Sequence, residues 1–224
     1  MGCVTTMKIT DKKRLSKLVS FLAMSDGSIH NSRNSKNYLF SFSATEDHMD
    51  IIKYVEGVIN NITSTKIYSC PKEAPRKTIY KVYTPTHPYF NALHERIYVG
   101  SYKSIDNHSL KQLDYEALAI WYMCDGCLGK SINKKTGKVN YSTTINLCRL
   151  SYGDLLLVKK AIKDKLDLEF NVVKTNRKYF TLRLRTKDLE KFIDGISPYI
   201  LDSFKYKIDF RTVNPIDTIG GDIV

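Results

Sequence analysis

One stretch of the chain, Ala117-Leu-Ala-Ile-Trp-Tyr-Met-Cys-Asp125-Gly126, limits the possible folds more than any other. Its first eight residues carry no charge, and a helix that is apolar on every side must be buried on every side. Gly126 can take the left-handed conformation that ends a helix. The stretch therefore predicts that Asp125 ends a buried helix, where the helix dipole disfavours a carboxylate unless a cation joins it.

A second copy of this pattern runs from Leu15 to Asp26-Gly27. One such stretch is most simply a core helix that ends in a turn, but two copies favour a paired arrangement. The two Asp-Gly pairs are 99 residues apart, and three further segments recur in the same order at offsets of 103, 104 and 104. The nearly constant offset indicates an internal duplication. The recurring segments are Asn37-Tyr38 with Asn140-Tyr141, Asp50-Ile-Ile-Lys with Asp154-Leu-Leu-Leu, and Tyr102-Lys103-Ser-Ile with Tyr206-Lys207-Ile.

The composition is typical of a protein that binds a polyanion. The chain has 224 residues, enough for one large or two small domains. A net charge of +12 and 15 Tyr favour nucleic acid as the partner, the alternative being a basic soluble protein. We expect no membrane span and no secretion, because an apolar run of about 18 residues and a signal peptide are both missing.

The five Cys lack the spacing of a disulfide framework and indicate a reducing, intracellular compartment, either bacterial or phage-host cytoplasm or an organelle. Cys124 and Cys127 form a CxxC, but the second pair that a zinc site needs does not follow. We therefore interpret Cys124 as a small residue that packs between helices.

Periodicity predicts the same order of elements in both halves: helix, two strands, helix, two strands, helix. Asp11 is the expected N-cap of the first helix, and the segment from Ser151 to Asp154 the expected cap of a later one. In the first half we predict helices over 11–25, 45–61 and 85–98 and strands over 28–33, 38–43, 66–70 and 78–83. In the second half we predict the helix that ends at 125, strands over 129–134, 140–147, 170–175 and 179–185, and helices over 151–166 and from 188.

The two apolar stretches resemble the motif of the LAGLIDADG homing endonuclease family. The copies read Val19-Ser-Phe-Leu-Ala-Met-Ser-Asp26-Gly27 and Leu118-Ala-Ile-Trp-Tyr-Met-Cys-Asp125-Gly126, and the final Asp-Gly is the most informative part of the motif. Phe21 and Ile120 replace the glycine at the third position. The small residues expected to let the two helices touch are then Ala23, Ser25, Ala119 and Cys124.

The resemblance covers about residues 11–210 and implies an α+β fold. Two αββαββα repeats would form a pseudosymmetric saddle of antiparallel sheets over double-stranded DNA, with the two motif helices side by side at the centre. A monomer is implied, because both motifs lie in one chain. We expect a leader over 1–10, repeats over 11–103 and 114–210, a linker over 104–113 and a tail over 211–224.

If the two helices lie side by side, Asp26 and Asp125 converge. Two close carboxylates cannot both ionise cheaply without a cation, and oxygen ligands favour Mg²⁺, for which we expect Mn²⁺ to substitute. The backbone oxygens of Ser25 and Cys124 are candidate further ligands, since the last carbonyls of a helix lack partners. For each Asp alone, a helix-end turn residue is the alternative interpretation.

The family resemblance also concerns Lys103 and Lys207, which occupy matching places near the end of each half. In the family, a lysine in a comparable position lies close to the scissile phosphates, where it would stabilise the charge of the transition state. The alternative is a solvated lysine, or one that positions a phosphate.

The strand faces are the expected DNA-binding surface, because a two-stranded ribbon fits the major groove. Where aromatic and aliphatic side chains face the core, the alternate polar ones face outward. Arg suits guanine edges or phosphates and Asn suits adenine, although each side chain can also be merely exposed. The candidates are Asn37, Ser41, Ser43, Lys66, Tyr68, Arg76, Thr78, Tyr80, Asn140, Ser142, Thr144, Asn146, Thr181, Arg183 and Arg185.

Three functions are compatible with this resemblance. The first is a site-specific, intron-encoded or freestanding endonuclease that cuts both strands of a long asymmetric DNA site, leaves short 3′ overhangs and promotes intron mobility. The second is a maturase that binds intron RNA and assists splicing, alone or as a second activity. The third is a DNA-binding regulator that has lost cleavage. Retention of Asp26 and Asp125 favours the first.

Overall fold

The fold is described from a computed structural model, over residues 7–31, 35–73, 75–133, 135–147, 150–175 and 179–210. The end of the predicted strand at 28–33, most of the leader, the tail over 211–224, Cys3 and Cys148 lie outside these residues. In the described part of the chain, no helix combines the length and the apolar character needed to cross a bilayer.

Both halves contain the predicted helices and strands. The first half consists of α1 (Lys12–Met24), β1 (Ser28–Asn31), β2 (Tyr38–Thr45), the 3-10 helix η1 (Glu46–His48), α2 (Met49–Ile59), β3 (Lys66–Cys70), β4 (Ile79–Tyr83) and α3 (Tyr89–Ile97). The second consists of α5 (Tyr115–Asp125), β7 (Gly126–Ile132), β8 (Val139–Ile145), α6 (Tyr152–Leu166), β9 (Phe170–Thr175), β10 (Tyr179–Leu184), η2 (Thr186–Asp188), α7 (Leu189–Ile196), η3 (Ser197–Tyr199) and η4 (Asp202–Lys207).

Four short elements were not predicted. They are β5 (Tyr98–Val99) and β6 (Tyr102–Lys103), which form a hairpin, the short helix α4 (Asn107–Leu110) and the 3-10 helix η4. Each is shorter than the window over which a hydrophobic period can be read. They nevertheless matter, because Lys103 lies in β6 and Lys207 ends η4.

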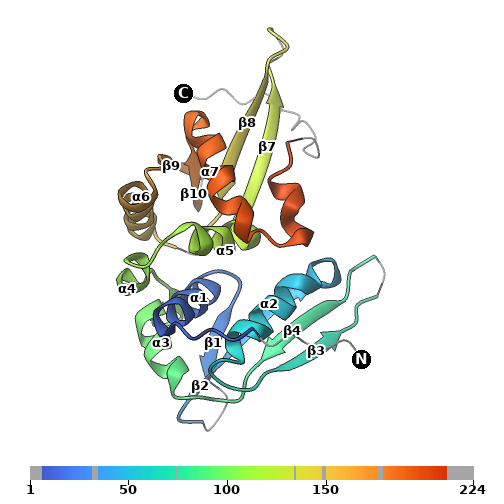
Figure 1. Ribbon diagram of the computed structural model, residues 1–224, viewed down its shortest axis with the longest axis vertical. Helices are drawn as coiled ribbons and strands as arrows, with labels where there is room; N and C mark the ends of the chain where they lie inside the picture. Colours follow the sequence, from blue (N-terminus) through green and yellow to red (C-terminus); the bar gives the residue numbers. More distant parts are fainter. Residues whose placement is uncertain are drawn as a thin grey trace.

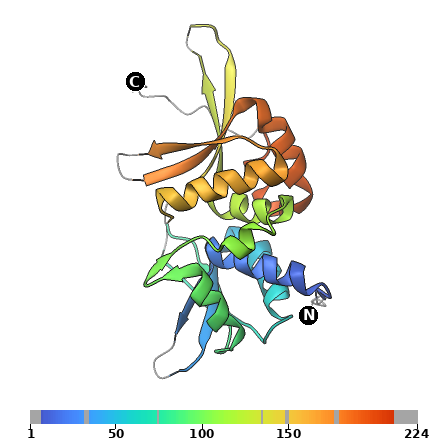
Figure 2. The same cartoon turned by 90° about the vertical axis from the view of Figure 1, so that its left-hand side faces the viewer.

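Each half forms one antiparallel sheet, with strand order β1-β2-β4-β3 in the first and β7-β8-β10-β9 in the second. The identical order confirms the predicted α+β fold with two pseudosymmetric halves. Figure 1 shows the halves one above the other, with α1 and α5 adjoining in the middle. Figure 2 shows that most helices lie on one side of the sheets and that the other side is left open.

The caps explain where the main helices begin. Asp11 accepts hydrogen bonds from the backbone amides of Lys13 (2.8 Å) and Arg14, which confirms the predicted N-cap. Asp114 caps α5 in the same way. Ser151 and Asp154 form a reciprocal capping box at the start of α6.

The side-by-side packing of α1 and α5 forms the centre of the core. The residues of α5 from Ala117 to Met123 are all buried, as the uniformly apolar sequence predicts, and the preceding Glu116 is buried as well. Where the family motif has a glycine at its third position, Phe21 packs against Trp121 with ring centroids 4.7 Å apart. Ala23 and Ala119 are fully buried. The contact between the two helices therefore includes large aromatic side chains.

Gly126 does not have the left-handed conformation that we expected, and Gly27, which follows α1, does not have it either. Gly126 is extended, with φ −84° and ψ 150°, and Gly27 is not among the residues with positive φ. The requirement at both sites is space: a Cβ on Gly126 would lie 2.1 Å from the Tyr122 ring, and one on Gly27 would lie 2.4 Å from the Leu22 carbonyl oxygen. The strand after each helix begins too close to the helix for any side chain.

A charge cluster with a buried ion pair at its centre joins the N-terminal parts of α1 and α5. Lys17 and Glu116, which are repeat-equivalent positions, pair at 2.9 Å, and both are buried. Glu116 also accepts from Arg14, and Lys17 also pairs with Asp114. Burial alone would raise the pKa of Glu116, but the hydrogen bonds from Arg14 and Lys17 outweigh it and the pKa falls below the usual value.

We predict that Glu116→Gln lowers the free energy of unfolding by about 3 kcal/mol at pH 7, because Lys17 is left buried with a weaker partner. Since folding lowers the pKa of Glu116, its stabilisation is present above the ordinary glutamate pKa and is lost as the pH falls through the folded value. The gap between variant and wild type should therefore shrink below about pH 4. Urea titrations at several pH values measure it.

Asp164→Asn, which removes the exposed Lys160–Asp164 pair of α6, is the matched control and should change stability little at any pH. Equal effects of the two substitutions would contradict a structural role for the buried pair.

Candidate catalytic centre and nucleic-acid surface

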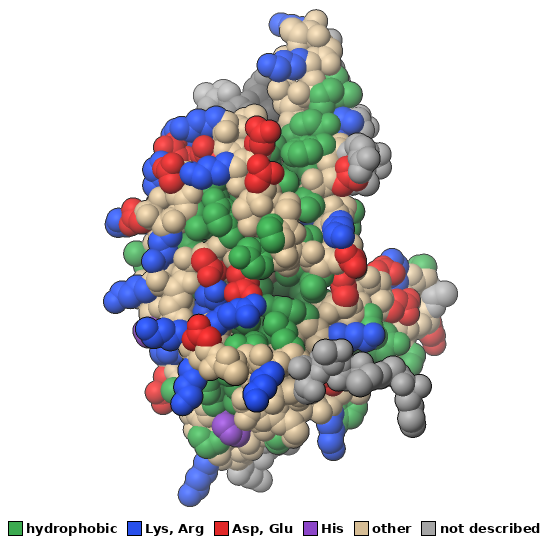
Figure 3. All heavy atoms as spheres, in the orientation of Figure 1, with side chains coloured by type: hydrophobic (Ala, Val, Ile, Leu, Met, Phe, Trp, Pro, Cys, Tyr) green, Lys and Arg blue, Asp and Glu red, His purple; other side chains and the backbone are tan. Residues whose placement is uncertain are grey.

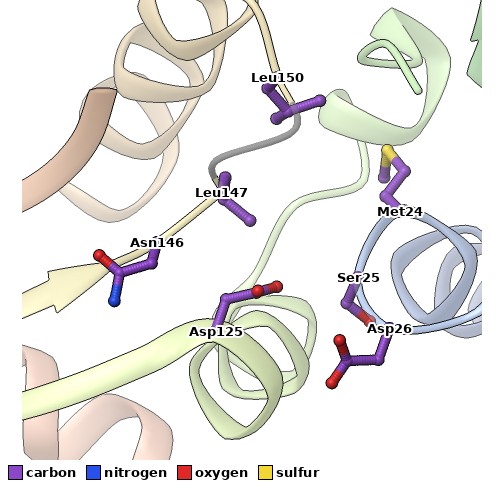
Figure 4. A pocket seen from close by; sticks show the side chains of 7 residues that line it. All are labelled: Met24, Ser25, Asp26, Asp125, Asn146, Leu147 and Leu150. Atoms are coloured by element: carbon purple, nitrogen blue, oxygen red, sulfur yellow. The ribbon is translucent and has the colours of Figure 1, made fainter. Parts of the chain in front are cut away.

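The C-terminal ends of α1 and α5 bring Asp26 and Asp125 to one cavity. This central cavity has a volume of about 150 Å³, and Figure 4 shows both carboxylates directed into the space between the helix ends. Asp26 is exposed and Asp125 is half-buried. The other lining residues are Met24, Ser25, Asn146, Leu147 and Leu150. The two acids that the sequence singles out thus share one site.

The two predicted lysines lie beside these helix ends. Lys103 Nζ donates to the backbone oxygens of Ser25 (2.6 Å) and Gly27 (2.5 Å). Lys207 Nζ donates to the backbone oxygen of Met123 (2.6 Å). Each ammonium group therefore neutralises the negative end of a helix dipole. The carboxylate of Asp26 or Asp125 lies at the same helix end, where the dipole alone would disfavour it.

Burial lowers the pKa of Lys207 below the usual lysine value, and the nearby charges of Asp125 and Asp26 only partly offset this effect. The side chain lies in a second, flanking cavity of about 230 Å³, which it shares with Asp26, His48, Cys124 and Tyr206 among others. Ser43 in the flanking cavity and Asn146 in the central one are repeat-equivalent. The two cavities are thus related by the duplication but differ in their side chains.

Cys124 is near enough to Asp26 and Asp125 for both charges to act on it, and it is not paired with Cys127. Burial and the neighbouring charge of Asp26 raise the pKa of the Cys124 thiol to about 12, whereas Cys127 is exposed on β7. A thiol with so high a pKa is protonated at neutral pH and is a poor metal ligand. Within the described residues, no three His, Cys, Asp or Glu side chains cluster in a way that could hold a metal.

The donors that remain suit a hard cation. Asp26 and Asp125 supply carboxylate oxygens from two elements, and Mg²⁺ is usually held by one or two carboxylates together with water and substrate phosphate. The backbone oxygen of Ser25, a predicted ligand, already accepts a hydrogen bond from the Lys103 ammonium, which competes with a cation. At the end of α5, the Lys207 ammonium group donates to the backbone oxygens of Tyr122 and Met123, which precede Cys124.

The open face of the second sheet carries the side chains expected there. Antiparallel partners point to the same face, so Thr144 lies beside Arg183, and the buried pair Ile145 and Leu182 faces the helices. Asn140 and Ser142 follow on the same open face of β8 by alternation, and Asn146 continues it beyond the strand. Thr181 faces the same way but is buried, donating to the Ile145 carbonyl at 2.8 Å and contacting Asn146 Oδ1 at 2.8 Å.

In the first sheet, the predicted face of β4 is the wrong one. Val82 pairs with Phe42, and both are buried under the helices, so Tyr80 and Thr78 share that covered side. The segment that forms β4 reads Thr78-Ile-Tyr-Lys-Val-Tyr83 and has apolar residues on both faces. Alternation alone therefore did not show which face of the strand is covered by the helices. The open face carries Ser41, Ser43, Lys66 and Tyr68 as predicted, and also His30, Lys81 and Tyr83, which were missed.

Three other predicted side chains have partners or lie apart from the sheets. The Asn37 carboxamide accepts from Asn91 at 2.9 Å. Arg185 forms an ion pair with Glu169, beyond the end of β10. Arg76 is exposed in the loop between β3 and β4.

On the helix-covered face of the molecule, basic side chains are accompanied by acidic ones. On the helix-covered face in Figure 3, Lys and Arg lie interspersed with Asp and Glu. Lys163 and Lys191, for example, both pair with Asp167.

Towards the open side, the β5–β6 hairpin projects between the halves, and its Tyr102 is 77% exposed (Figure 2). The repeat-equivalent Tyr206 is also exposed, so both tyrosines next to the lysines are available for contact.

Comparison with known proteins agrees with this geometry. The model of the family described as LAGLIDADG DNA endonuclease matches residues 22–192. The cytochrome b mRNA maturase bI2 of Debaryomyces hansenii is 24% identical over 216 residues, which are 90% of this chain and 75% of that protein. The protein of the same name from Saccharomyces cerevisiae is 27% identical over 150 residues, which are 61% of this chain and 32% of that protein.

Solved structures share the fold. The homing endonuclease I-WcaI bound to its DNA recognition sequence superposes with a TM-score of 0.72 at 21% identity, over 92% of this chain and 91% of that one. The meganuclease I-AabMI bound to uncleaved DNA gives a TM-score of 0.56 at 13% identity, over 85% and 86% of the two chains.

We predict that iodoacetamide at pH 8 alkylates Cys127 and leaves Cys124 almost unmodified. The thiolate is the reactive form, and a pKa of about 12 leaves roughly one Cys124 in 10⁴ ionised at that pH. Peptide mapping by mass spectrometry measures both sites in one sample, and a sample unfolded in urea is the control, in which the two should react alike. Rapid alkylation of Cys124 in the folded protein would contradict its placement between the helix ends.

Proposed function

The chain belongs to the LAGLIDADG DNA endonuclease family, and from this we propose that it is a single-chain homing endonuclease that cuts both strands of a long, asymmetric DNA site. The observation that carries the proposal is the convergence of Asp26 and Asp125 on one cavity at the centre of two open sheets. We further propose short 3′ overhangs, a monomeric state and a role in intron mobility.

The proposed reaction is hydrolysis of one phosphodiester in each strand, with one Asp assigned to each. Asp26 and Asp125 would hold divalent cations, with Mg²⁺ the expected ion and Mn²⁺ a substitute. When bound, such a cation activates water and stabilises charge on the phosphate and the leaving oxygen. The carboxylate oxygens and the partly polar lining of the cavity support this assignment.

Lys103 and Lys207 would contribute fixed positive charge near the reacting phosphates. Their hydrogen bonds to helix-end carbonyls hold each ammonium group beside a carboxylate before DNA arrives. Such preorganisation removes the cost of arranging these charges during the reaction.

The open sheet faces would bind the DNA. They form two antiparallel surfaces on the same side of the molecule, and each contains two-stranded ribbons of the kind that a major groove admits. Lys66 and Lys81 in the first half and Arg183 in the second supply positive charge, and Asn140, Ser142 and Thr144 supply hydrogen-bonding groups. Structures of similar fold bound to DNA support this orientation.

An RNA maturase is the second candidate, because both relatives from yeasts are named as maturases of cytochrome b mRNA. A maturase needs a surface for structured RNA but does not need two converging acids. The retained Asp26 and Asp125 therefore favour cleavage, without opposing a dual activity. A regulator that lost cleavage is disfavoured for the same reason.

We predict that the wild-type protein makes discrete double-strand cuts in a randomised duplex library with Mg²⁺. Asp26→Asn and Asp125→Asn should each slow cleavage of one strand by roughly 10²–10³-fold, because charge stabilisation at that phosphate is lost. Sequencing of the cut ends, with both strands labelled, measures each rate, and a reaction in Ca²⁺ serves for comparison. Absence of cutting by the wild type, together with tight binding to a structured intron RNA, would favour the maturase.

We also predict that Lys81→Ala weakens DNA binding and reduces the slope of log K against log salt concentration by about 1, as expected for one lost phosphate contact. Thr78→Ala is the matched control, since it lies on the same segment but faces the helices. Fluorescence anisotropy at several salt concentrations measures both variants. An equal loss in the control would show that the open face is not the binding surface.

A further inference from the structure

Two repeat-related acids, Asp50 and Asp154, have no part in the chemistry proposed above. They lie in the first turns of α2 and α6, one in each half. Both form hydrogen bonds across the boundary between the halves. Asp50 accepts from the Ser203 backbone amide (2.9 Å) and hydroxyl (2.6 Å). Asp154 accepts from the Ser104 hydroxyl at 3.1 Å.

Each acid therefore binds the segment of the other half that carries its lysine. Ser104 directly follows Lys103, and Ser203 is in η4, which ends at Lys207. The contacts are reciprocal: α6 of the second half holds the first half's lysine segment, and α2 of the first half holds the second half's. The duplication preserves both the acids and the lysines that their contacts position.

The local geometry strengthens both contacts. Asp154 Oδ2 accepts from the Ser151 backbone amide (3.1 Å), which is part of the capping box, and from the Ser151 hydroxyl (2.7 Å). These bonds fix the carboxylate while Oδ1 reaches Ser104. On the other side, Nδ1 of His48 lies 3.0 Å from the Ser203 hydroxyl. Because the single hydroxyl proton of Ser203 is donated to Asp50, His48 is the donor in that contact.

The His48 ring also stacks on Phe204, with centroids 4.3 Å apart. Phe204 in turn lies under Lys207, whose Nζ is 5.5 Å from the ring centroid. A continuous chain of contacts thus runs from the start of α2 to the ammonium group of Lys207. The connection from Asp154 to Lys103 is shorter, because Ser104, which Asp154 contacts, directly follows Lys103 in the sequence.

We propose that Asp50 and Asp154 are positioning residues, each of which holds the lysine of the opposite half at the end of that half's catalytic helix. The proposal rests on the proposed nuclease function for its effect on cleavage. It makes each half of the catalytic centre depend on the other half: Lys103 beside Asp26 depends on Asp154, and Lys207 beside Asp125 depends on Asp50.

Lysine labelling of the DNA-free protein tests the positioning itself. In the wild type, reductive methylation should be slow at the buried Lys103 and intermediate at the half-buried Lys207. Asp154→Asn should accelerate labelling of Lys103 several-fold and leave Lys207 unchanged, and Asp50→Asn should do the reverse. Mass spectrometry of the peptides gives both rates, and thermal melting verifies that each variant is folded. Labelling of both lysines at wild-type rates in both folded variants would overturn the proposal.

Strand-resolved cleavage tests the consequence. A misplacement on the scale of 1 Å costs about 10²-fold in rate, so each variant should slow the cut of one strand by ten- to a hundredfold relative to the other, and the two variants should affect opposite strands. Equal slowing of both strands would overturn the proposal. If the wild type does not cut at all, the nuclease function fails, and labelling alone then decides the positioning role.

Two substitutions serve as controls. Asp164→Asn and Asp202→Asn each remove a carboxylate from α6 or η4 without touching the cross-half contacts. Both should keep the wild-type labelling ratio of Lys103 to Lys207, and a changed ratio in either of them would show that general loosening of the element explains the effect.

Discussion

The structure depends on the side-by-side packing of α1 and α5, because a helix without a polar face is stable only when neighbours cover every side. For α5, the neighbours are α1, α7, η3 and the start of the second sheet. The two helices run in the same direction, so that Lys17 meets Glu116 at one end and Asp26 meets Asp125 at the other. The contact that closes the core therefore also brings the two carboxylates together.

Much of the fold follows from local signals in the sequence. Alternation and helical periodicity are properties of neighbouring residues, and a duplication gives each signal twice, so the helices, the strands and their order were predictable. The open face of β8 was also predictable, because Tyr141, Thr143 and Ile145 alternate with polar residues. Convergence of Asp26 and Asp125 followed from the family resemblance and needed no knowledge of side-chain contacts.

What the sequence could not supply are contacts between distant segments. In β4, apolar residues occur on both faces, and only the packing of Val82 against Phe42 decides which face is covered. Gly126 suggested a left-handed turn, but the reason for a glycine is the Tyr122 side chain beside it. The partners of Lys103 and Asp154 lie many residues away, and no periodic pattern connects them.

The duplication also explains how equivalent positions at the centre of the molecule can carry different side chains. In a symmetric dimer, a position facing its own copy carries the same side chain twice, and two buried lysines or two buried glutamates would repel each other. Within one chain the equivalent positions can differ, and here Lys17 pairs with Glu116. The same freedom lets Ser43 and Asn146 line the two cavities. An asymmetric protein surface of this kind suits the asymmetric DNA site proposed above, because the two sheets need not carry the same side chains.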